Sequence, residues 1–260
     1  MKFAFYKYHG TGNDFIIIDN RDMRFDRKRT EVVKKLCDRR FGIGADGLML
    51  LQNKPGFDFE MVYYNSDGNE GSMCGNGGRC IVAFAKTVGL VNEKARFAAS
   101  DGEHEATVKS EQISLKMGDV NNIEKGNGFY FLNTGSPHYV SFVKDVAHFP
   151  VFEEGKKIRY NDRFKIKGIN VNFIEKTGDE LFVRTYERGV EDETYSCGTG
   201  VTAAALVASL EKISTKTDQC SIKVLGGKLN VKFKNNSDKS FTDIWLEGPA
   251  VFVFKGEAKI

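Results

Sequence analysis

A near-repeat within the chain limits its fold more than any other feature of the sequence. The tetrapeptide Cys-Gly-Asn-Gly at 74–77 recurs 123 positions later as Cys-Gly-Thr-Gly at 197–200. Tyr64, at the end of a strand-like run, recurs as Tyr186 at a spacing of 122. At the first spacing, Thr11-Gly12 also matches Thr134-Gly135. Matches that share one spacing predict two halves of similar architecture.

We expect the first half to comprise residues 1–119 plus 250–260 and the second half to comprise residues 120–249. At 260 residues the chain can form two halves of about 130 residues, each with its own core. Cys74 then belongs to the first half and Cys197 to the second. We expect the active site in the cleft between the two halves.

Runs of β-branched and aromatic residues predict strands. The clearest such runs are 58–64, 105–109, 180–186 and 222–225. The Ala-rich segments 76–88 and 199–211 each follow a Cys-Gly-x-Gly motif and are apolar on all sides, which predicts buried helices. A third, amphipathic helix is begun by Thr30. The expected fold class is α/β (α+β), with two pseudo-symmetric halves, each a strongly curved mixed or antiparallel sheet wrapped round a central helix.

Charge and hydropathy exclude several classes of protein. Lys and Arg number 38 against 35 Asp and Glu, a net charge of +3, which does not indicate a nucleic-acid partner. The longest apolar runs are about six residues, far below the roughly 18 that span a bilayer. The N-terminal segment has no secretory signal, so we expect a cytoplasmic protein with no membrane partner. The five cysteines are an odd count without CxxC spacing, which argues against a disulfide framework or a metal site.

The two repeated cysteines have the setting of reactive thiols. A cysteine at a helix N-terminus lies beside unpaired backbone N–H groups and the positive end of the helix dipole, which favour the thiolate. The glycines that follow allow a ligand to approach the backbone, so the same N–H groups can hold a carboxylate. We therefore expect Cys74 and Cys197 to be functional. We interpret Cys37, Cys80 and Cys220 as core residues.

Two such cysteines, related by an internal repeat, indicate a racemase. Inverting a stereocentre without a redox step needs a base on one face of a carbon and an acid on the other. Because the reverse reaction exchanges these roles, two chemically similar groups are suited to both directions. Backbone donors for the substrate carboxylate would stabilise the enolate-like transition state. No cofactor is implied, neither pyridoxal phosphate nor a metal.

Other functions remain open at this point. A cysteine hydrolase with His138 as base would form a covalent intermediate and leave one of the two cysteines unused. A thiol-disulfide sensor or a binding protein would need no exchange at carbon. A proline or hydroxyproline racemase normally carries a histidine after the first Cys-Gly, where this chain has Asn76.

Several polar residues near the motifs are further candidates. His138 lies inside a repeated segment, and Glu187 and Arg188 end a strand ten residues before Cys197. Arg188 could bind a substrate carboxylate. Four asparagines lie at glycine-flanked strand or helix ends, where Asn is also a common turn residue: Asn13, Asn65, Asn76 and Asn170.

Four motifs together resemble the diaminopimelate epimerase family. They are HGTGNDF from His9, YNSDGNEGSMCGNGGRC from Tyr64, GSPH from Gly135 and YERGVEDETYSCGTG from Tyr186. The resemblance extends to the closing GPAVFVF. It implies a cofactor-independent epimerase that interconverts LL- and meso-diaminopimelate in lysine and peptidoglycan precursor synthesis. It also implies the two-half α/β fold, with the last strand returning to the first half, and commonly a homodimer.

The resemblance also assigns roles to residues of this chain. Cys74 and Cys197 would be the acid and base, with His138 and Glu187 tuning the thiols. Backbone at Gly75, Asn76, Gly198 and Thr199 would hold the reacting carboxylate. The remaining polar groups of the substrate would be held by the side chains of Asn13, Asn65, Asn170, Glu187 and Arg188.

Two departures from the family pattern bear on substrate preference. Gly47 stands where some members carry a glutamine that contacts the substrate. Ser136 replaces the asparagine of the common Asn-Pro-His. The substitution at 136 keeps a polar side chain but shortens it.

Overall fold

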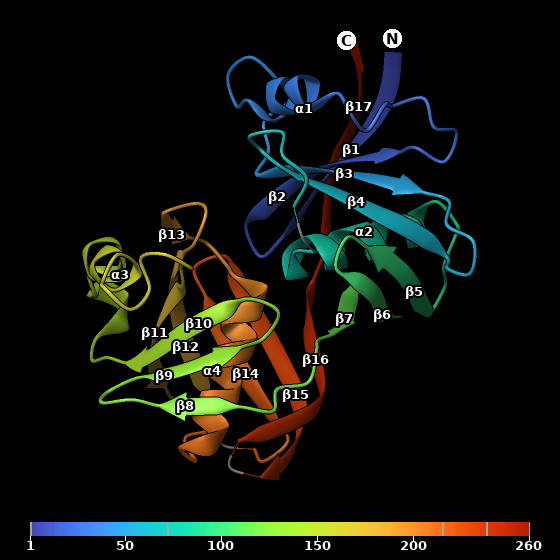
Figure 1. Cartoon of the computed structure of the whole chain (residues 1–260). Coiled ribbons are helices and arrows are strands. Elements are labelled where there is room, and N and C mark those ends of the chain that lie inside the picture. The colour runs from blue at the N-terminus through green and yellow to red at the C-terminus, as the bar shows by residue number, and fades with distance from the viewer. Residues whose placement is uncertain (1, 72, 215, 238, 260) are drawn as a thin grey trace. The chain divides into compact units, whose positions relative to one another are not determined.

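A computed structural model describes residues 2–71, 73–214, 216–237 and 239–259 and divides the chain into two compact units. Met1–Leu115 and Pro249–Ile260 form the first unit, and Lys116–Gly248 form the second (Figure 1). Each unit is a mixed sheet with few helices, so the expected α/β class is confirmed.

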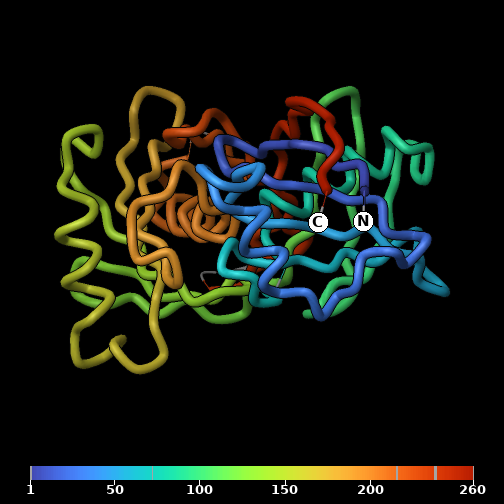
Figure 2. The backbone as a smooth tube through the Cα atoms, turned by 90° about the horizontal axis from the view of Figure 1, so that it is seen from above, coloured from blue at the N-terminus to red at the C-terminus, as the bar shows by residue number. Residues whose placement is uncertain are grey.

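The C-terminal strand of the chain forms one edge of the sheet of the first unit. In order of pairing, its strands are β17 (Val251–Lys259), β1 (Lys2–Gly10), β2 (Asn13–Asp19), β3 (Gly47–Gln52), β4 (Phe59–Asn65), β5 (Lys94–Ala99), β6 (Gly102–Lys109) and β7 (Gln112–Lys116). The β2–β3 and β4–β5 pairs are parallel and the other pairs are antiparallel. Lys2 pairs with Lys259, so the two ends of the chain lie side by side (Figure 2).

The second unit repeats this topology. Its strands, in the same order of pairing, are β8 (Ile123–Lys125), β9 (Tyr130–Asn133), β10 (Pro137–Phe142), β11 (Asn170–Thr177), β12 (Glu180–Glu187), β14 (Gln219–Val224), β15 (Gly227–Ser237) and β16 (Ser240–Pro249). Here β10–β11 and β12–β14 are the parallel pairs, at the same two places in the order. A short β13 (Asp192–Thr194) also pairs with β12. The sequence spacing of 123 therefore reflects a repeated succession of strands.

One buried helix packs on the sheet of each unit. Helix α2 (Gly75–Thr87) contacts β1, β2, β3 and β6, and helix α4 (Gly198–Leu210) contacts the equivalent strands and their neighbours (Figure 1). The segment from Val201 to Ala208 is buried throughout, as its continuous apolar sequence predicts. In α2, two polar side chains, Asn76 and Arg79, are also completely buried.

The remaining helices show where the sequence interpretation was incomplete. Helix α1 (Thr30–Cys37) begins at Thr30, as the sequence predicts, with Arg29 at the N-cap position and no side-chain cap. Helix α3 (Val151–Arg159), preceded by a 3-10 turn (Val146–His148), was not predicted. Its central Gly155 argues against a helix. In the structure, however, a Cβ at Gly155 would lie 2.4 Å from Cβ of Tyr186, so close packing against β12 requires the glycine.

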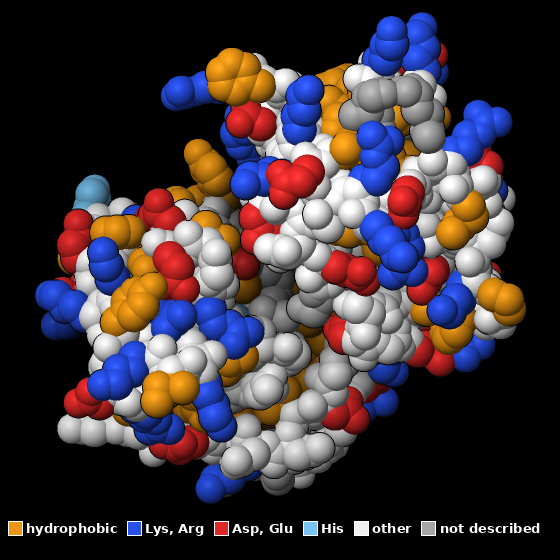
Figure 3. Space-filling model, turned by 45° about the horizontal axis from the view of Figure 1, so that its top comes forward, with side chains coloured by type: hydrophobic (Ala, Val, Ile, Leu, Met, Phe, Trp, Pro, Cys, Tyr) orange, Lys and Arg blue, Asp and Glu red, His pale blue; other side chains and the backbone are white. Residues whose placement is uncertain are grey.

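The surface is polar and of mixed sign. On the face seen in Figure 3, Lys and Arg side chains are interspersed with Asp and Glu side chains. Within the described part of the chain, no helix is both long enough and apolar enough to cross a membrane.

Candidate active site

Cys74 is the N-cap residue of α2, as the sequence predicts. Its backbone is extended, with φ −101° and ψ 129°, and its carbonyl accepts the first helical hydrogen bond from Gly78 N–H at 2.7 Å. Its Sγ lies 3.7 Å from Oδ1 of Asn13, at the start of β2, and the residue is partly exposed. The next two residues, Gly75 and Asn76, form the first turn of the helix. The thiol is thus held beside the first backbone N–H groups of the helix, at the positive end of its dipole.

A network of charged groups fixes the amide of Asn13. Its Nδ2 donates to Oδ2 of Asp46 at 2.6 Å, so its Oδ1 faces Cys74 and also accepts from Nδ2 of Asn76 at 3.5 Å. Arg39 bonds both Asp46 and Asp14. Burial raises the pKa of Asp14, but hydrogen bonds from Arg39 and Lys7 outweigh burial and hold it at about 2. Asp14 is therefore ionised at neutral pH, and the hydrogen bond to Asp46 keeps Asn13 in one orientation.

Cys197 occupies the equivalent position in the second unit. It is the N-cap residue of α4, with φ −121° and ψ 110°, and its carbonyl accepts from Val201 N–H at 2.8 Å. It is more buried than Cys74, at 6% exposure. Its Sγ lies 3.5 Å from Oγ1 of Thr199 in the first turn of the helix.

His138, on β10, is joined to Cys197 through Thr199. Its Nε2 lies 2.9 Å from Thr199 Oγ1, and its Nδ1 lies 3.1 Å from Nδ2 of Asn172. Asn172 Nδ2 also donates to the Tyr139 carbonyl, which fixes the orientation of that amide and makes His138 Nδ1 an acceptor. The hydrogen of His138 is therefore on Nε2, and it donates to Thr199. Thr199 can in turn donate its own hydrogen to Cys197.

The imidazole of His138 is neutral. The side chain is completely buried, and burial, with a smaller contribution from the charge of Arg188, lowers its pKa to about 3. A neutral imidazole does not act on Cys197 as a cation. It is joined to Cys197 through the series of hydrogen bonds that runs from Asn172 through His138 and Thr199.

Asn170, Arg188 and Ser136 form one cluster at the ends of β11 and β12. Oδ1 of Asn170 accepts from the backbone N–H of Arg188 at 2.9 Å, and its Nδ2 donates to Ser136 Oγ at 2.9 Å. The Arg188 guanidinium also reaches Ser136 Oγ, at 3.3 Å. The short side chain of Ser136 is thus bonded to both partners. Glu187 is the last residue of β12, directly before Arg188 in the sequence, and its side chain is partly buried.

The departure at Gly47 has a steric explanation. A Cβ at this position would lie 2.6 Å from Cε2 of Tyr63 and 2.6 Å from the carbonyl oxygen of Tyr64. The ring of Tyr63 therefore occupies the space beside residue 47. Asn65, at the end of β4, is exposed, and its Nδ2 would lie 3.2 Å from a Cβ at Gly71.

The other three cysteines are buried and poorly ionisable. Burial raises the pKa of Cys37 to about 12 and that of Cys220 to about 11, and it raises the pKa of Cys80 still further. These thiols are therefore inert at neutral pH, as expected of core residues.

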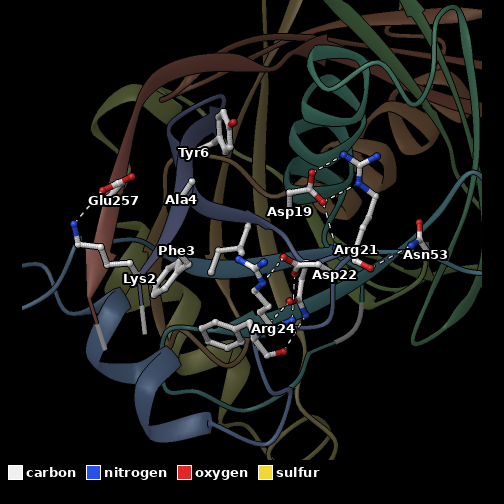
Figure 4. Close-up of a pocket in the computed structure, with 13 residues that line it drawn as sticks. Lys2, Phe3, Ala4, Tyr6, Asp19, Arg21, Asp22, Arg24, Asn53 and Glu257 are labelled. Carbon is white, nitrogen blue, oxygen red and sulfur yellow. Dashed lines mark hydrogen bonds and ion pairs between the residues drawn. The ribbon is translucent and has the colours of Figure 1, made fainter.

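One cavity of the first unit is lined by neither cysteine of the repeated motif. It has a volume of about 700 Å³ and lies in the first unit, against β1, β2 and the loop after β2 (Figure 4). Its charged lining groups are paired with one another: Asp19 with Arg21 at 2.6 Å, Asp22 with Arg24 at 3.0 Å, and Lys2 with Glu257 at 3.7 Å. No lining charge is left for a ligand among these pairs. Over the described residues, no group of three or more His, Cys, Asp or Glu side chains is arranged to hold a metal ion.

Sequence reasoning missed three residues of this environment. Asp46, Arg79 and Asn172 were not identified as candidates, although each is bonded directly to a candidate residue. Asn172 follows Asn170 by two positions on β11, so the Asn-x-Asn pattern on a strand was the available signal.

The fold defines the class of protein first. The solved structure of a PhzF-family phenazine biosynthesis protein from Bacillus anthracis superposes with a TM-score of 0.78 at 15% identity, over the full length of both chains. A hydroxyproline epimerase from Agrobacterium vitis gives a TM-score of 0.70 at 14% identity, over 99% of this chain and 91% of that one. The chain shares the fold of these proteins.

Sequence comparison then gives the family. The model of the family described as "Diaminopimelate epimerase" matches residues 5–123 and 130–253. A diaminopimelate epimerase from Flavobacterium psychrophilum is 54% identical, over 96% of this chain and 98% of the relative. One from Chlorobaculum tepidum is 43% identical, over 95% and 98%. The chain belongs to the diaminopimelate epimerase family and is an isomerase.

Proposed function

We propose that this chain interconverts LL- and meso-diaminopimelate with Cys74 and Cys197 as the acid and base. The observation that carries the proposal is the equivalence of the two residues. Each is the N-cap of a buried helix, and each helix occupies the same place in one of two units of identical strand order. Two like groups at two like positions suit a reaction whose reverse exchanges their roles.

In this mechanism the thiolate of one cysteine takes the α-proton, so that the C–H bond breaks and an S–H bond forms. The electron pair left on carbon is delocalised into the substrate carboxylate. The other cysteine then gives its proton to the opposite face of the carbon and is left as the thiolate. No redox change occurs and no cofactor takes part. The mechanism requires the two thiols to meet opposite faces of one carbon.

Backbone donors support the carbanion. We propose that N–H groups at Gly75, Asn76, Gly198 and Thr199 bind the reacting carboxylate, because the first N–H groups of a helix point out of its N-terminus, where the helix dipole favours an anion. Charge that develops on the carboxylate oxygens is then stabilised by donors already in place.

We assign the rest of the substrate to side chains of both units. They are Asn13, Asn65, Asn170, Glu187 and Arg188. The bond from Arg188 N–H to Asn170 supports this assignment, because it holds a guanidinium and an amide at one place, a pair able to bind a second carboxylate and an ammonium.

The decisive experiment follows LL-diaminopimelate by proton NMR in D2O with reduced enzyme. We expect the α-proton signal to decline as the meso isomer forms, and both changes to be abolished in Cys74→Ala and in Cys197→Ala. Epimerisation that survives in both variants would refute the two-thiol mechanism. Lack of exchange by the wild type, with its thiols shown to be reduced, would exclude diaminopimelate as substrate.

We further propose that the protein is a homodimer and works in the cytoplasm. A thiolate base needs a reducing compartment, which supports the location. Support for the dimer comes from β17, where four consecutive apolar residues, Val251 to Phe254, are each 41 to 51% exposed. An apolar strand of this kind favours association unless it is covered.

Sedimentation equilibrium tests the dimer. We expect twice the chain mass of 29.1 kDa for the wild type and the single mass for Val253→Lys. Ile166→Lys, at an 88% exposed position in the other unit, is the matched control and should remain a dimer. A monomeric wild type would refute the proposal.

A further inference from the structure

Arg79 is a buried charge that the two-thiol mechanism does not use. It lies on α2, five residues after Cys74, and its side chain is 0% exposed. Its guanidinium donates to the Gly75 carbonyl at 3.2 Å, the Pro249 carbonyl at 3.4 Å, Thr11 Oγ1 at 3.3 Å and Asn76 Oδ1 at 3.0 Å. All four acceptors are neutral.

A buried cation without an anion is costly. Desolvation of a charge is normally offset by a paired charge, and within the described residues no carboxylate accepts a hydrogen bond from Arg79. Burial lowers the pKa of Arg79, but a guanidinium remains protonated in proteins. The position therefore attracts negative charge to the start of α2.

The ionisable groups that face α2 leave this charge uncompensated. By strand alternation and register they include Tyr6 and Tyr8 on β1, Asp19 on β2, Tyr63 on β4 and His104 on β6. Asp14 on β2 also acts electrostatically on Cys80 of α2, but its charge is paired with Lys7 and Arg39. Asp19 is bonded to Arg21 and His104 to Asp101. Burial raises the pKa of Tyr8, so its phenol carries no charge near pH 7.

Two thiols lie close enough to interact electrostatically with Arg79, and only one is suited to ionise. They are Cys80 and Cys74. Cys80 is completely buried, and its pKa is strongly raised by that burial. Cys74 is partly exposed and lies at the helix start, so it is the group that can carry the balancing negative charge.

Among the described residues of the second unit, no Lys or Arg side chain is buried in this way. The residue equivalent to Arg79 is Thr202, whose Oγ1 donates to the Gly198 carbonyl at 3.0 Å, just as Arg79 donates to Gly75. The ionisable groups on the strand faces against α4 include the neutral His138, the thiol Cys220, Tyr130, which is bonded to Glu211 at the far end of the helix, and Glu187, which shares the face of Thr185. Arg188 contributes to the lowered pKa of His138, but it is exposed to solvent, which weakens its charge relative to that of the buried Arg79.

We propose that Arg79 is a positioning residue that makes Cys74 the more acidic of the two thiols, so that Cys74 is the thiolate and Cys197 the thiol before substrate binds. Through Nη2 the same residue also fixes the amide of Asn76, which bonds Asn13 beside the Cys74 sulfur. This inference rests on the proposed two-thiol function, but it concerns the ligand-free protein.

The test measures the ionisation of each thiol separately. The reduced, ligand-free protein is alkylated with iodoacetamide over a range of pH, and the Cys74 and Cys197 peptides are quantified by mass spectrometry. Because the midpoint of each pH profile does not depend on how accessible the thiol is, it can be compared between the two residues. We expect the Cys74 midpoint to lie at lower pH. A lower midpoint for Cys197 would overturn the proposal without any variant.

Variants then identify the cause. In Arg79→Met we expect the Cys74 profile to move to higher pH by about one unit or more, and in Arg79→Lys to move back part of the way, with Cys197 unchanged in both. Thr202→Val is the matched control, since it removes the equivalent hydrogen bond without removing a charge, and it should move neither profile. An unchanged Cys74 profile in folded Arg79→Met would refute the inference. If instead the proposed epimerase function were wrong, the NMR assay would show no α-proton exchange, while the alkylation profiles would still be those expected from Arg79.

Discussion

Replacing Thr199 by valine tests the series of hydrogen bonds that ends at Cys197. The Thr199 hydroxyl lies 2.9 Å from His138 Nε2 and 3.5 Å from Cys197 Sγ. Valine has nearly the same shape but neither accepts nor donates a hydrogen bond. Thr199→Val therefore removes one acceptor from a buried imidazole N–H and one donor from the sulfur.

The two losses have different magnitudes and different readouts. A buried donor left without a partner costs about 1 to 3 kcal/mol, which should appear as a lower free energy of unfolding. A hydrogen bond to a charged group contributes about 1.5 to 3 kcal/mol. In the proposed mechanism Cys197 is a thiolate before proton transfer when it acts as the base, and after proton transfer when it acts as the acid. Losing its donor should therefore lower kcat about ten- to hundredfold, since 1.4 kcal/mol corresponds to about a factor of ten.

Both quantities are measurable on the same preparations. Urea denaturation gives stability, and the diaminopimelate NMR assay gives kcat and KM. Thr199→Ser keeps the hydroxyl and should retain most of both. If Thr199→Val matched Thr199→Ser in kcat, the hydroxyl would not act on Cys197, and the direction of hydrogen bonding inferred from Asn172 would be wrong.

Three further predictions concern stability and close packing. The folded-state pKa of His138, about 3, lies below its unfolded value near 6.5, so only the unfolded chain binds this proton between those limits. Stability should therefore fall as pH is lowered from about 6.5, by up to about 1.4 kcal/mol per pH unit from this group, as measured by urea titrations. Gly47→Ala places a Cβ 2.6 Å from Tyr63 and should destabilise the fold by about 1 to 3 kcal/mol in the same titrations. Gly200→Ala places a Cβ 2.3 Å from Asn172 Oδ1, and it should lower kcat by displacing that amide from His138.

Each of these has a control or a contradicting result. In His138→Gln the free energy of unfolding should lose most of its dependence on pH below about 6.5. His148→Gln, at an exposed position, should keep this dependence. Equal pH dependence in the two variants would contradict a buried neutral imidazole at His138. For Gly47→Ala, added Tyr63→Ala should restore part of the stability, and a fully stable single variant would contradict the steric explanation. Gly77→Ala is the matched control for position 200, because its Cβ meets a flexible methionine sulfur at 3.3 Å.

The sequence predicts the architecture well where one local signal decides it. Cys-Gly-x-Gly before an Ala-rich run predicts both buried helices and the N-cap positions of Cys74 and Cys197, because glycine starts and continuous apolarity are properties of the segment itself. The strands at 58–64 and 180–186 are found for the same reason. Helix α3 has no such local signal, because its Gly155 is explained only by the contact with Tyr186 on another element.

Polar networks are predicted less well, because their partners are distant along the chain. Arg79 is bonded to Thr11 and Pro249, which are 68 and 170 positions away. Asn172 is bonded to His138 across 34 positions. No local pattern distinguishes a buried arginine of this kind from the many solvated ones. The distant partners of Arg79, Thr11 and Pro249, are brought together by the register of β1 with β2 and β17. The sequence of α2 carries no information about this register.

The two units are alike in what places the sulfur and unlike in what surrounds it. Strand order, helix position and N-cap geometry are repeated, whereas the contacts of the two sulfurs differ. Cys74 lies beside Asn13, whose amide is bonded to Asp46 and to Asn76, a partner of Arg79. Cys197 lies beside Thr199, which is bonded to His138. A reaction between two mirror-image forms would give no reason for this difference. Diaminopimelate is not such a case, because one stereocentre stays fixed while the other inverts, so the two faces of the reacting carbon are never equivalent within the enzyme. Equal geometry with unequal electrostatics is what such a substrate requires.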